Sequence, residues 1–170
     1  MRKGRGFFLL VVAFTGCASS PQDEFVRQLE KANSFELYSL EPFKDPDELS
    51  SLDEDPTGPG ERLHGWRVLG KTTVSDDPTR RVITRAFKKA LDRGTPNKCF
   101  YPRHAIRITD GDTTIDLVIC FGCENFSVCR NEKWDDGPSR VISRELQPTL
   151  DEALTRAGIP LAKKSKAAAD

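Results

Sequence analysis

The sequence lacks an apolar run long enough to cross a lipid bilayer. Its longest run covers residues 7–14, eight residues in all, whereas a membrane-spanning helix needs about 20. Three basic residues precede this run, and Thr15-Gly16 leads from it to Cys17. A basic start, a short apolar stretch and a small-residue junction together predict a secretory signal, so we expect residues 1–16 to direct export.

The sequence also lacks the common signatures of catalysis. It contains no GxSxG, Walker or dinucleotide-binding glycine pattern, and it has only two histidines. His104 follows Arg103 and is the candidate general base of an enzyme that uses both residues in a cleft, but no partner nucleophile is evident. The alternative is a structural, hydrogen-bonded histidine. The sequence therefore favours a non-enzymatic protein over an enzyme.

An excess of basic charge is missing as well. The whole chain carries 26 basic and 26 acidic residues, and removal of residues 1–16 takes away three basic residues and no acidic one. The remaining chain has a net charge of −3, which gives no support to nucleic-acid binding, because that function requires a basic domain. Its length is sufficient for one domain with a modest core.

Residues 14–17, Phe-Thr-Gly-Cys, resemble the lipobox of bacterial lipoprotein precursors. They match it at Thr15, Gly16 and Cys17, and Phe14 stands where leucine is usual. The resemblance covers about the first twenty residues. It implies that residues 1–16 are a lipoprotein signal peptide that is removed, and that Cys17 is diacylated through a thioether. An ordinary signal peptide with a chance cysteine and an uncleaved anchor are the alternatives.

The lipoprotein resemblance also predicts where the protein resides. Two or three acyl chains on one residue anchor a protein stably, whereas one chain binds only marginally. In enteric bacteria an aspartate after the lipidated cysteine favours the inner membrane, and Ala18 stands at that position here. We therefore expect a protein anchored by lipid to a bacterial membrane, preferentially the outer membrane, with its domain in the periplasm.

The patterning of residues 17–162 predicts a single α+β domain. We expect a small antiparallel sheet of four to six strands with about three helices packed on one face. Helices are expected at 21–32, from Asp77-Pro78 to Gly94, and from Pro148 to Gly158. Strands are expected at 35–40, 65–74, 126–132 and 140–144, in addition to a hairpin. No internal repeat is visible.

Two segments are expected to lie outside the packed domain. Residues 44–62 combine acidic residues with prolines and glycines and predict a long exposed loop. Residues 163–170 carry lysines among alanines and predict a flexible basic tail, with contact to anionic headgroups as the alternative.

The helix expected after residue 77 has two contrasting sides. Its apolar stripe consists of Val82, Ile83, Ala86, Phe87, Ala90 and Leu91. Its other side is basic and consists of Arg80, Arg81, Arg85, Lys88, Lys89 and Arg93. A solvated surface and a surface that faces headgroups or binds a ligand are the two interpretations of this side.

The segments on either side of an Asp-Gly-Asp turn at 110–112 alternate and predict a β-hairpin. Three turn registers are possible, and each places Cys99 within one residue of Cys123 on the opposite strand, provided that pairing continues through Pro102. Cross-strand neighbours lie within disulfide reach, and an exported protein folds in an oxidising compartment. We therefore predict a Cys99–Cys123 disulfide.

The other cysteines leave alternatives open. Apart from Cys17, four cysteines remain, and they allow three connectivities. The second predicted pair is Cys120–Cys129, with a buried free thiol at Cys120 as the alternative. Cys120-Phe-Gly-Cys123 is a CxxC motif and suggests thiol redox chemistry, but a reactive first cysteine normally begins a helix, whereas this motif ends a predicted strand.

Zinc is the metal alternative. Its ligands would be Cys99, His104, Cys120 and Cys123. A structural zinc site usually needs two paired cysteine knuckles and this chain has one, so the sequence otherwise predicts no metal and no cofactor.

The combination C-F-x-P-R-H-A-I-R with D-L-V-I-C-F-x-C, preceded by H-G-W-R-V-L-G-K, resembles an uncharacterised family of bacterial proteins, many of them exported. The resemblance covers roughly residues 25–162. The matching positions are His64, Gly65, Trp66, Cys99, Pro102, Arg103, His104, Cys120 and Cys123. It implies one domain and supplies no mechanism. Cys129 lies outside the shared pattern, which weakens the prediction of a Cys120–Cys129 disulfide.

These observations predict a lipid-anchored cell-envelope protein of unknown molecular activity. We expect a non-enzymatic binding or structural module that contacts the membrane through its anchor and binds an envelope protein or a ligand, and not nucleic acid. The alternative is a metal-binding or thiol-redox module built on Cys99, His104, Cys120 and Cys123.

Overall fold

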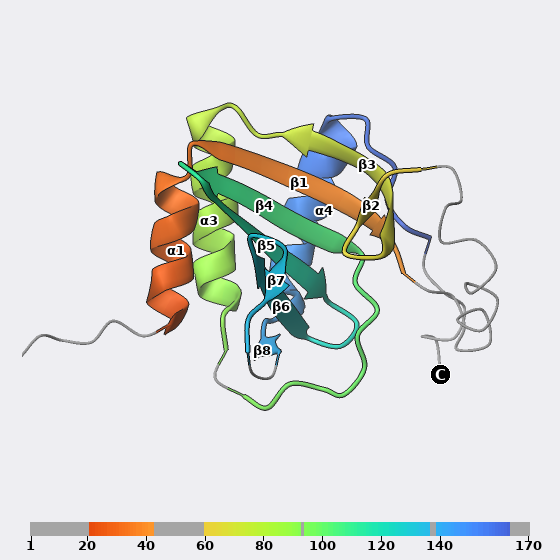
Figure 1. The fold of residues 1–170 in the computed structure, drawn as a ribbon. Helices are drawn as coiled ribbons and strands as arrows, with labels where there is room; N and C mark the ends of the chain where they lie inside the picture. Colours follow the sequence, from red (N-terminus) through yellow and green to blue (C-terminus); the bar gives the residue numbers. More distant parts are fainter. Residues whose placement is uncertain (1–20, 43–59, 93, 137–138, 164–170) are drawn as a thin grey trace, which may run out of the picture.

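The computed structural model describes residues 21–42, 60–92, 94–136 and 139–163. The predicted signal peptide and Cys17, almost all of the predicted acidic loop, and residues 164–170 lie outside these ranges. The elements in chain order (Figure 1) are α1 (Pro21–Lys31), β1 (Ser34–Glu41), β2 (Arg62–Leu63), β3 (Trp66–Thr73), α3 (Asp77–Ala90), β4 (His104–Asp110), β5 (Thr113–Cys120), β6 (Asn125–Arg130), β7 (Lys133–Trp134), β8 (Arg140–Val141), a 3₁₀ turn η1 (Arg144–Leu146) and α4 (Gln147–Arg156).

The strands form one curled antiparallel sheet. Their order is β2-β3-β1-β4-β5-β6-β7, and β8 pairs with β6. The α+β prediction is therefore confirmed. The expected four to six strands were too few, because β2 and β7 have two residues each and are too short to show alternation. The strand expected at 140–144 is present only as the two residues of β8. Arg62, the last residue of the predicted loop, belongs to β2.

The helix α3 shows how local chemistry sets the ends of an element. Asp76, and not Asp77, is the N-cap, since its side chain accepts a hydrogen bond from Thr79 N at 2.8 Å. The helix ends at Ala90 and does not continue to Gly94, because Leu91 is extended and forms a bridge with Ile142. Val82 is 55% exposed, so the apolar stripe is narrower than predicted.

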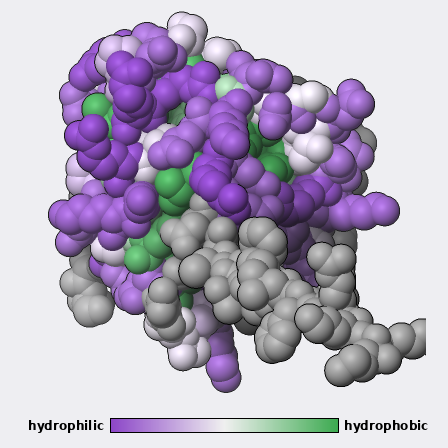
Figure 2. Space-filling view, turned by 90° about the vertical axis from the view of Figure 1, so that its left-hand side faces the viewer, coloured by the Kyte–Doolittle hydropathy of each residue, from purple (hydrophilic) through white to green (hydrophobic). Residues whose placement is uncertain are grey.

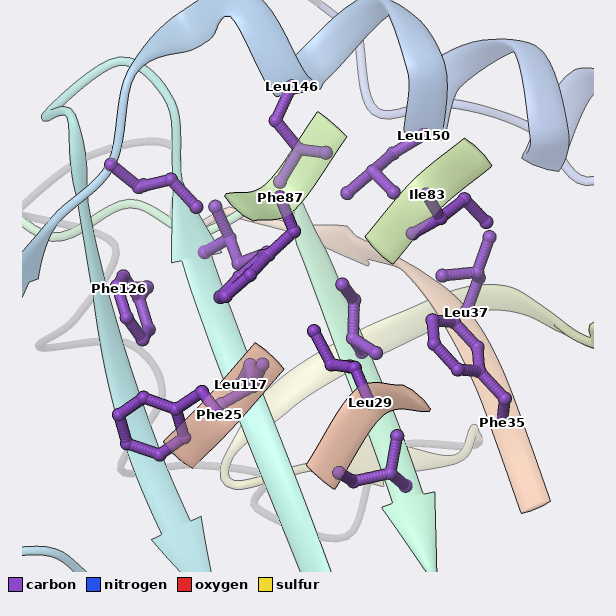
Figure 3. Packing of buried hydrophobic residues seen from close by; sticks show 14 of the residues in the cluster. Phe25, Leu29, Phe35, Leu37, Ile83, Phe87, Leu117, Phe126, Leu146 and Leu150 are labelled. Carbon is purple, nitrogen blue, oxygen red and sulfur yellow. The ribbon is translucent and has the colours of Figure 1, made fainter. Parts of the chain in front are cut away.

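The main core lies between the sheet and the three helices. Alternate residues of the central strands point toward the helices, and Figure 3 shows them interleaved with side chains from α1, α3 and α4. Phe126 of β6 is at its centre, with edge-on ring contacts to Phe87 at 5.6 Å and to Phe25 at 6.1 Å. Each such buried side chain contributes about 1.5–3 kcal/mol to stability. Within the described residues, no helix has the length and apolarity that a membrane span requires.

A second, smaller core covers the opposite side of the sheet, which we call the outer face. It consists of Tyr38, Leu40, Leu63, Ala105 and Val118, with Trp66, Val68 and Phe100 packed against it. The turn between β2 and β3 brings His64 and Trp66 over this face, and positive φ angles at His64 (51°) and Gly65 (93°) make that turn. Aromatic rings from separate parts of the chain therefore cover the outer face.

Candidate functional site

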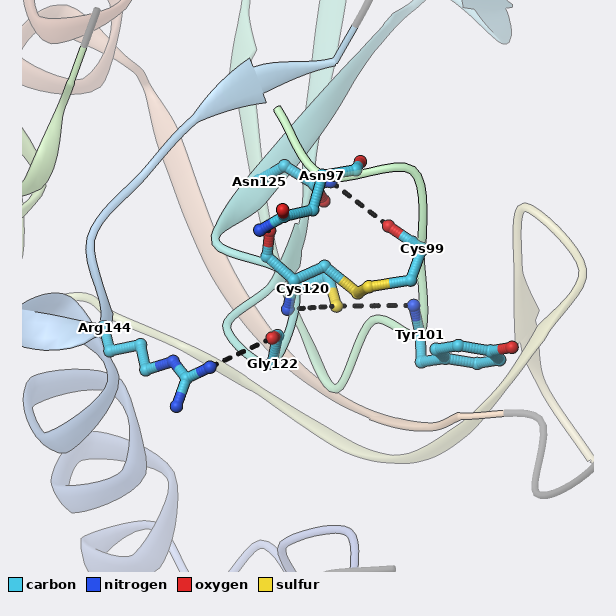
Figure 4. The surroundings of a disulfide bond; sticks show 8 residues. Asn97, Cys99, Tyr101, Cys120, Gly122, Asn125 and Arg144 are labelled. Atoms are coloured by element: carbon cyan, nitrogen blue, oxygen red, sulfur yellow. Dashed lines mark hydrogen bonds between the residues drawn. A yellow bond between two sulfur atoms is a disulfide. The ribbon is translucent and has the colours of Figure 1, made fainter. Parts of the chain in front are cut away.

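The structure joins Cys99 and Cys123 by a disulfide with a Cα–Cα distance of 5.8 Å, and these are the two cysteines that the sequence pairs (Figure 4). Asp110 lies opposite Thr113, so Gly111-Asp112 is the turn, one of the three predicted registers. Regular pairing stops at His104 and does not continue through Pro102. The preceding segment still follows β5, since Arg103 N donates to Ile119 O at 3.2 Å.

The predicted Cys120–Cys129 disulfide is wrong. Both cysteines are free and buried. Cys129 lies opposite Asp116 and Cys120 lies opposite Asn125 in the same strand pair. Four residues of extended strand span about 13 Å, beyond the Cα separation that a disulfide bridges. The alternative of a buried free thiol at Cys120 agrees with the structure.

The Cys120 thiol lies beside the disulfide (Figure 4). Its Sγ accepts hydrogen bonds from Tyr101 N at 3.3 Å and from Cys123 N at 3.2 Å. Burial raises the pKa of this thiol, although the backbone N–H groups act in the opposite direction. It is thus protonated at neutral pH and a weak nucleophile. The CxxC motif ends β5 and enters a turn, without the helix N-terminus that redox activity requires.

The four residues of the zinc alternative are not brought together. His104 lies opposite Ile119 and points toward the helices, whereas Cys120 follows Ile119 and points to the outer face. His104 Nε2 is 2.7 Å from Asp151 Oδ1 on α4. Within the described part of the chain, no group of three or more potential metal-binding side chains is present.

The pairing with Asp151 also bears on the enzyme alternative. A carboxylate only accepts hydrogen bonds, so the proton of neutral His104 lies on Nε2, and Nδ1 has no hydrogen-bond partner among the described residues. His104 is only 3% exposed, and its ring packs against Phe121. Arg103 instead donates to the backbone carbonyls of Ala162 and Lys163. The two residues that the sequence placed in one cleft therefore have separate partners.

The outer face carries a charged network that the sequence analysis missed. Arg107 of β4 lies opposite Asp116 of β5 and donates two hydrogen bonds to it, at 2.6 and 2.8 Å. His64 Nε2 lies 2.6 Å from Asp116 Oδ2. Burial would raise the pKa of Asp116, but the hydrogen bonds from Arg107 and His64 outweigh it and hold the pKa below its ordinary value. Asp116 is therefore a buried carboxylate at neutral pH.

Four rings lie side by side next to this network, and we call them the aromatic row: Phe100, Trp66, Trp134 and His64. Trp66 contacts Phe100 at 5.6 Å and Trp134 at 6.3 Å, both edge-on, and Trp134 contacts His64 at 4.8 Å. Trp134 is 44% exposed and Tyr101, which follows Phe100, is 45% exposed. The row thus presents aromatic surface to solvent from three separate chain segments.

The charged side chains beside the aromatic row are engaged with one another. Lys71 donates to Glu61 at 2.6 Å, and Glu36 accepts from the Tyr38 hydroxyl at 3.1 Å. Lys71 and Arg107 both lie 5.6 Å from the centre of the Tyr38 ring. Lys71 with Glu61 and Arg107 with Asp116 thus pair opposite charges on this face, whereas Glu36 bonds to a neutral hydroxyl.

One sequence signal could have revealed the network. In the register with Gly111-Asp112 as the turn, Arg107 falls opposite Asp116, a charged residue inside an apolar run. A buried carboxylate needs such a partner. No comparable signal connects His64 or Trp134 to this site, because both reach it from distant segments.

A comparison of the chain with protein families, curated proteins and solved structures finds no match. The resemblance to an uncharacterised exported family stays a prediction.

Proposed function

We propose that this protein is a lipid-anchored component of the bacterial cell envelope and a non-enzymatic binding module. The anchor rests on the lipobox-like residues that end at Cys17, four positions before the first residue of α1. With acylated Cys17 in the outer membrane, the domain lies in the periplasm and stays close to the membrane. Its binding surface is the aromatic row on the outer face.

The main support for this proposal is the solvent exposure of the aromatic row. Within the described residues only four large hydrophobic side chains are exposed, and two of them, Trp134 and Tyr101, lie in or next to the row. Exposed aromatic rings are typical of contact surfaces, because they give large apolar area at a low entropy loss. The row is thus the best-supported site for a ligand.

The chemistry of the surroundings favours a glycan as the ligand. Sugar rings have flat C–H faces that stack on aromatic rings and hydroxyl groups that exchange hydrogen bonds with polar neighbours. Two of the neighbouring charge pairs, Lys71–Glu61 and Arg107–Asp116, are balanced, so these positions do not select an ion of either sign. A neutral stretch of envelope polysaccharide fits this combination.

The histidines support a binding function over catalysis. His64 and His104 each lie within hydrogen-bond distance of a carboxylate, Asp116 and Asp151. In the described ranges, neither ring has a hydrogen bond to a hydroxyl or thiol that could act as a nucleophile. Both pairs connect separate elements of the fold, which is a structural role.

Tryptophan fluorescence tests the proposal directly, because both tryptophans of the chain, Trp66 and Trp134, belong to the aromatic row. We expect chitotetraose, a neutral β-linked amino-sugar oligomer, to shift the emission in a saturable way. Trp134→Ala should weaken binding at least about fivefold, since one ring stacked on a ligand contributes about 1–3 kcal/mol.

A matched control is Val82→Ala, which shortens another exposed apolar side chain, on α3, and it should leave the titration unchanged. Unaltered binding by Trp134→Ala would contradict the assignment of the row. If the tryptophan emission responds to a proline-rich peptide and to no glycan, the ligand is a peptide and the proposed glycan is wrong.

A further inference from the structure

A groove of about 580 Å³ runs between α1 and α3, across the sheet from the aromatic row. Its volume is within the range of ligand sites in proteins. Val26, Leu29 and Thr84 line its floor, and Arg81, Arg85 and Lys88 of α3 stand along its rim. Figure 2 shows the face that carries these helices, where small hydrophobic patches lie among hydrophilic residues. The groove therefore combines an apolar base with basic side chains.

Two of the basic side chains on the groove have no partner within the described ranges of the chain. Arg80 donates to the Ala32 carbonyl and lies over the Phe35 ring, and Arg81 pairs with Asp77 at 3.8 Å. Arg85 and Lys88 have no hydrogen bond or ion pair with any other residue that the structure describes. Among the residues described, two adjacent cations thus have no protein partner and can meet an anionic ligand.

The free cations lie at one end of the groove. The bond from Arg80 to the Ala32 carbonyl places the start of α3 beside the end of α1, and the two helices run side by side in opposite directions (Figure 1). Lys88 is eight residues further along α3, about 12 Å, which brings it level with the start of α1. Glu30, the acidic residue of α1 that lines the groove, is near the other end.

The start of α1 is also the end nearest the predicted anchor. Pro21 is four residues after Cys17, and four residues of chain span at most about 14 Å. Arg85 and Lys88 are therefore held close to the membrane surface if Cys17 is acylated. Val82, which neighbours Arg85 on the helix, adds a side chain that is 55% exposed and apolar.

We infer that this groove binds the headgroup of an anionic phospholipid of the membrane to which the protein is anchored. Arg85 and Lys88 hold the phosphate above the buried floor that Val26 and Leu29 form. The orientation toward the bilayer rests on the proposed lipid anchor, but the chemistry of the groove does not. Binding here fixes the helical side of the domain on the membrane and turns the aromatic row away from it.

The test separates the groove from the anchor. The full chain with Cys17→Ser, which carries no acyl group, is mixed with vesicles of phosphatidylcholine alone or with about 30% phosphatidylglycerol, and bound protein is measured by sedimentation. Residues 1–16 carry three basic residues and themselves favour the anionic vesicles. Their contribution is the same in every variant, so the groove is judged by the difference between variants on the same vesicles. We expect tighter binding to the anionic vesicles, and a loss of about 25-fold when Arg85→Ala and Lys88→Ala are combined, at roughly fivefold per basic residue.

The matched control combines Lys98→Ala and Lys133→Ala, which remove the same charge from exposed positions outside the groove. It should retain most of the binding. An equal loss in the control pair, or no loss in the groove pair, would overturn the inference. So would full competition by millimolar inorganic phosphate, which would show a site for free anions. Acylation of the native protein is tested separately. If the native protein carries no acyl group, the anchor is refuted and this result still stands.

Discussion

Arg107 and Asp116 face each other across the β4–β5 hairpin and are joined by two parallel hydrogen bonds of 2.6 and 2.8 Å. Asp116 is 97% buried, and a carboxylate in such a place is stable only when donors surround it. His64 supplies the third donor from a turn 52 residues away. The pair therefore links the hairpin to the turn that holds the aromatic row.

Replacing Arg107 tests this link. We expect Arg107→Ala to lower the free energy of unfolding by about 3 kcal/mol, since it leaves a buried carboxylate with one partner. Urea denaturation measures the change. Lys71→Ala is the control, because the Lys71–Glu61 pair is exposed and such pairs contribute about 1 kcal/mol or less. Equal small effects in both variants would show that Asp116 does not need Arg107.

The lowered pKa of Asp116 makes stability depend on pH. In the unfolded chain this carboxyl group takes up a proton near pH 4, whereas in the folded protein the hydrogen bonds from Arg107 and His64 keep it ionised to lower pH. The unfolded state then binds more protons, so the stabilisation is complete above about pH 5 and is lost as the pH falls below about 4.

Urea midpoints at pH 7 and pH 3 measure this loss. Asp116→Asn, which has no proton to gain, should be less stable at pH 7 and should lose less than the native protein between the two pH values. Parallel losses in both proteins would mean that other carboxyl groups cause the acid sensitivity.

The Cys99–Cys123 disulfide closes a loop with a sequence separation of 24. A disulfide that closes a loop of this size adds about 3 kcal/mol to the free energy of unfolding in the chain-entropy model. Its reduction should therefore lower the melting temperature by about 6–12 °C. The same melt with a chelator and no reductant should show no change. A melt that responds to the chelator would favour the zinc alternative.

The anchor prediction concerns Cys17. Cys17→Ser should abolish incorporation of radiolabelled palmitate and shift the protein from the membrane fraction to the soluble fraction, because no thiol remains next to the predicted cleavage site. Label in the variant equal to that in the native protein would end the lipoprotein assignment. In an enteric host, Ala18→Asp should keep acylation and move the protein from the outer to the inner membrane.

The sequence alone determined the elements whose signals are local. Helical spacing predicted α1, α3 and α4, and alternation predicted β1, β3 and the β4–β5 hairpin. The hairpin turn limited the register to three choices, and all three bring Cys99 next to Cys123, which is why this disulfide follows from the sequence. These predictions succeed because side-chain periodicity and turn chemistry act over a few neighbouring residues.

Only the tertiary structure decided the features that join distant segments. The predicted pairing of Cys120 with Cys129 was wrong because the register of β5 and β6 places them at opposite ends of the strand pair. The contact between His104 and Asp151 could not be predicted, because 47 residues separate them in the sequence. The aromatic row and the groove between α1 and α3 likewise consist of residues that no local pattern relates. Their positions depend on how the sheet curls and on which faces the helices cover, and this is set by packing of the whole core.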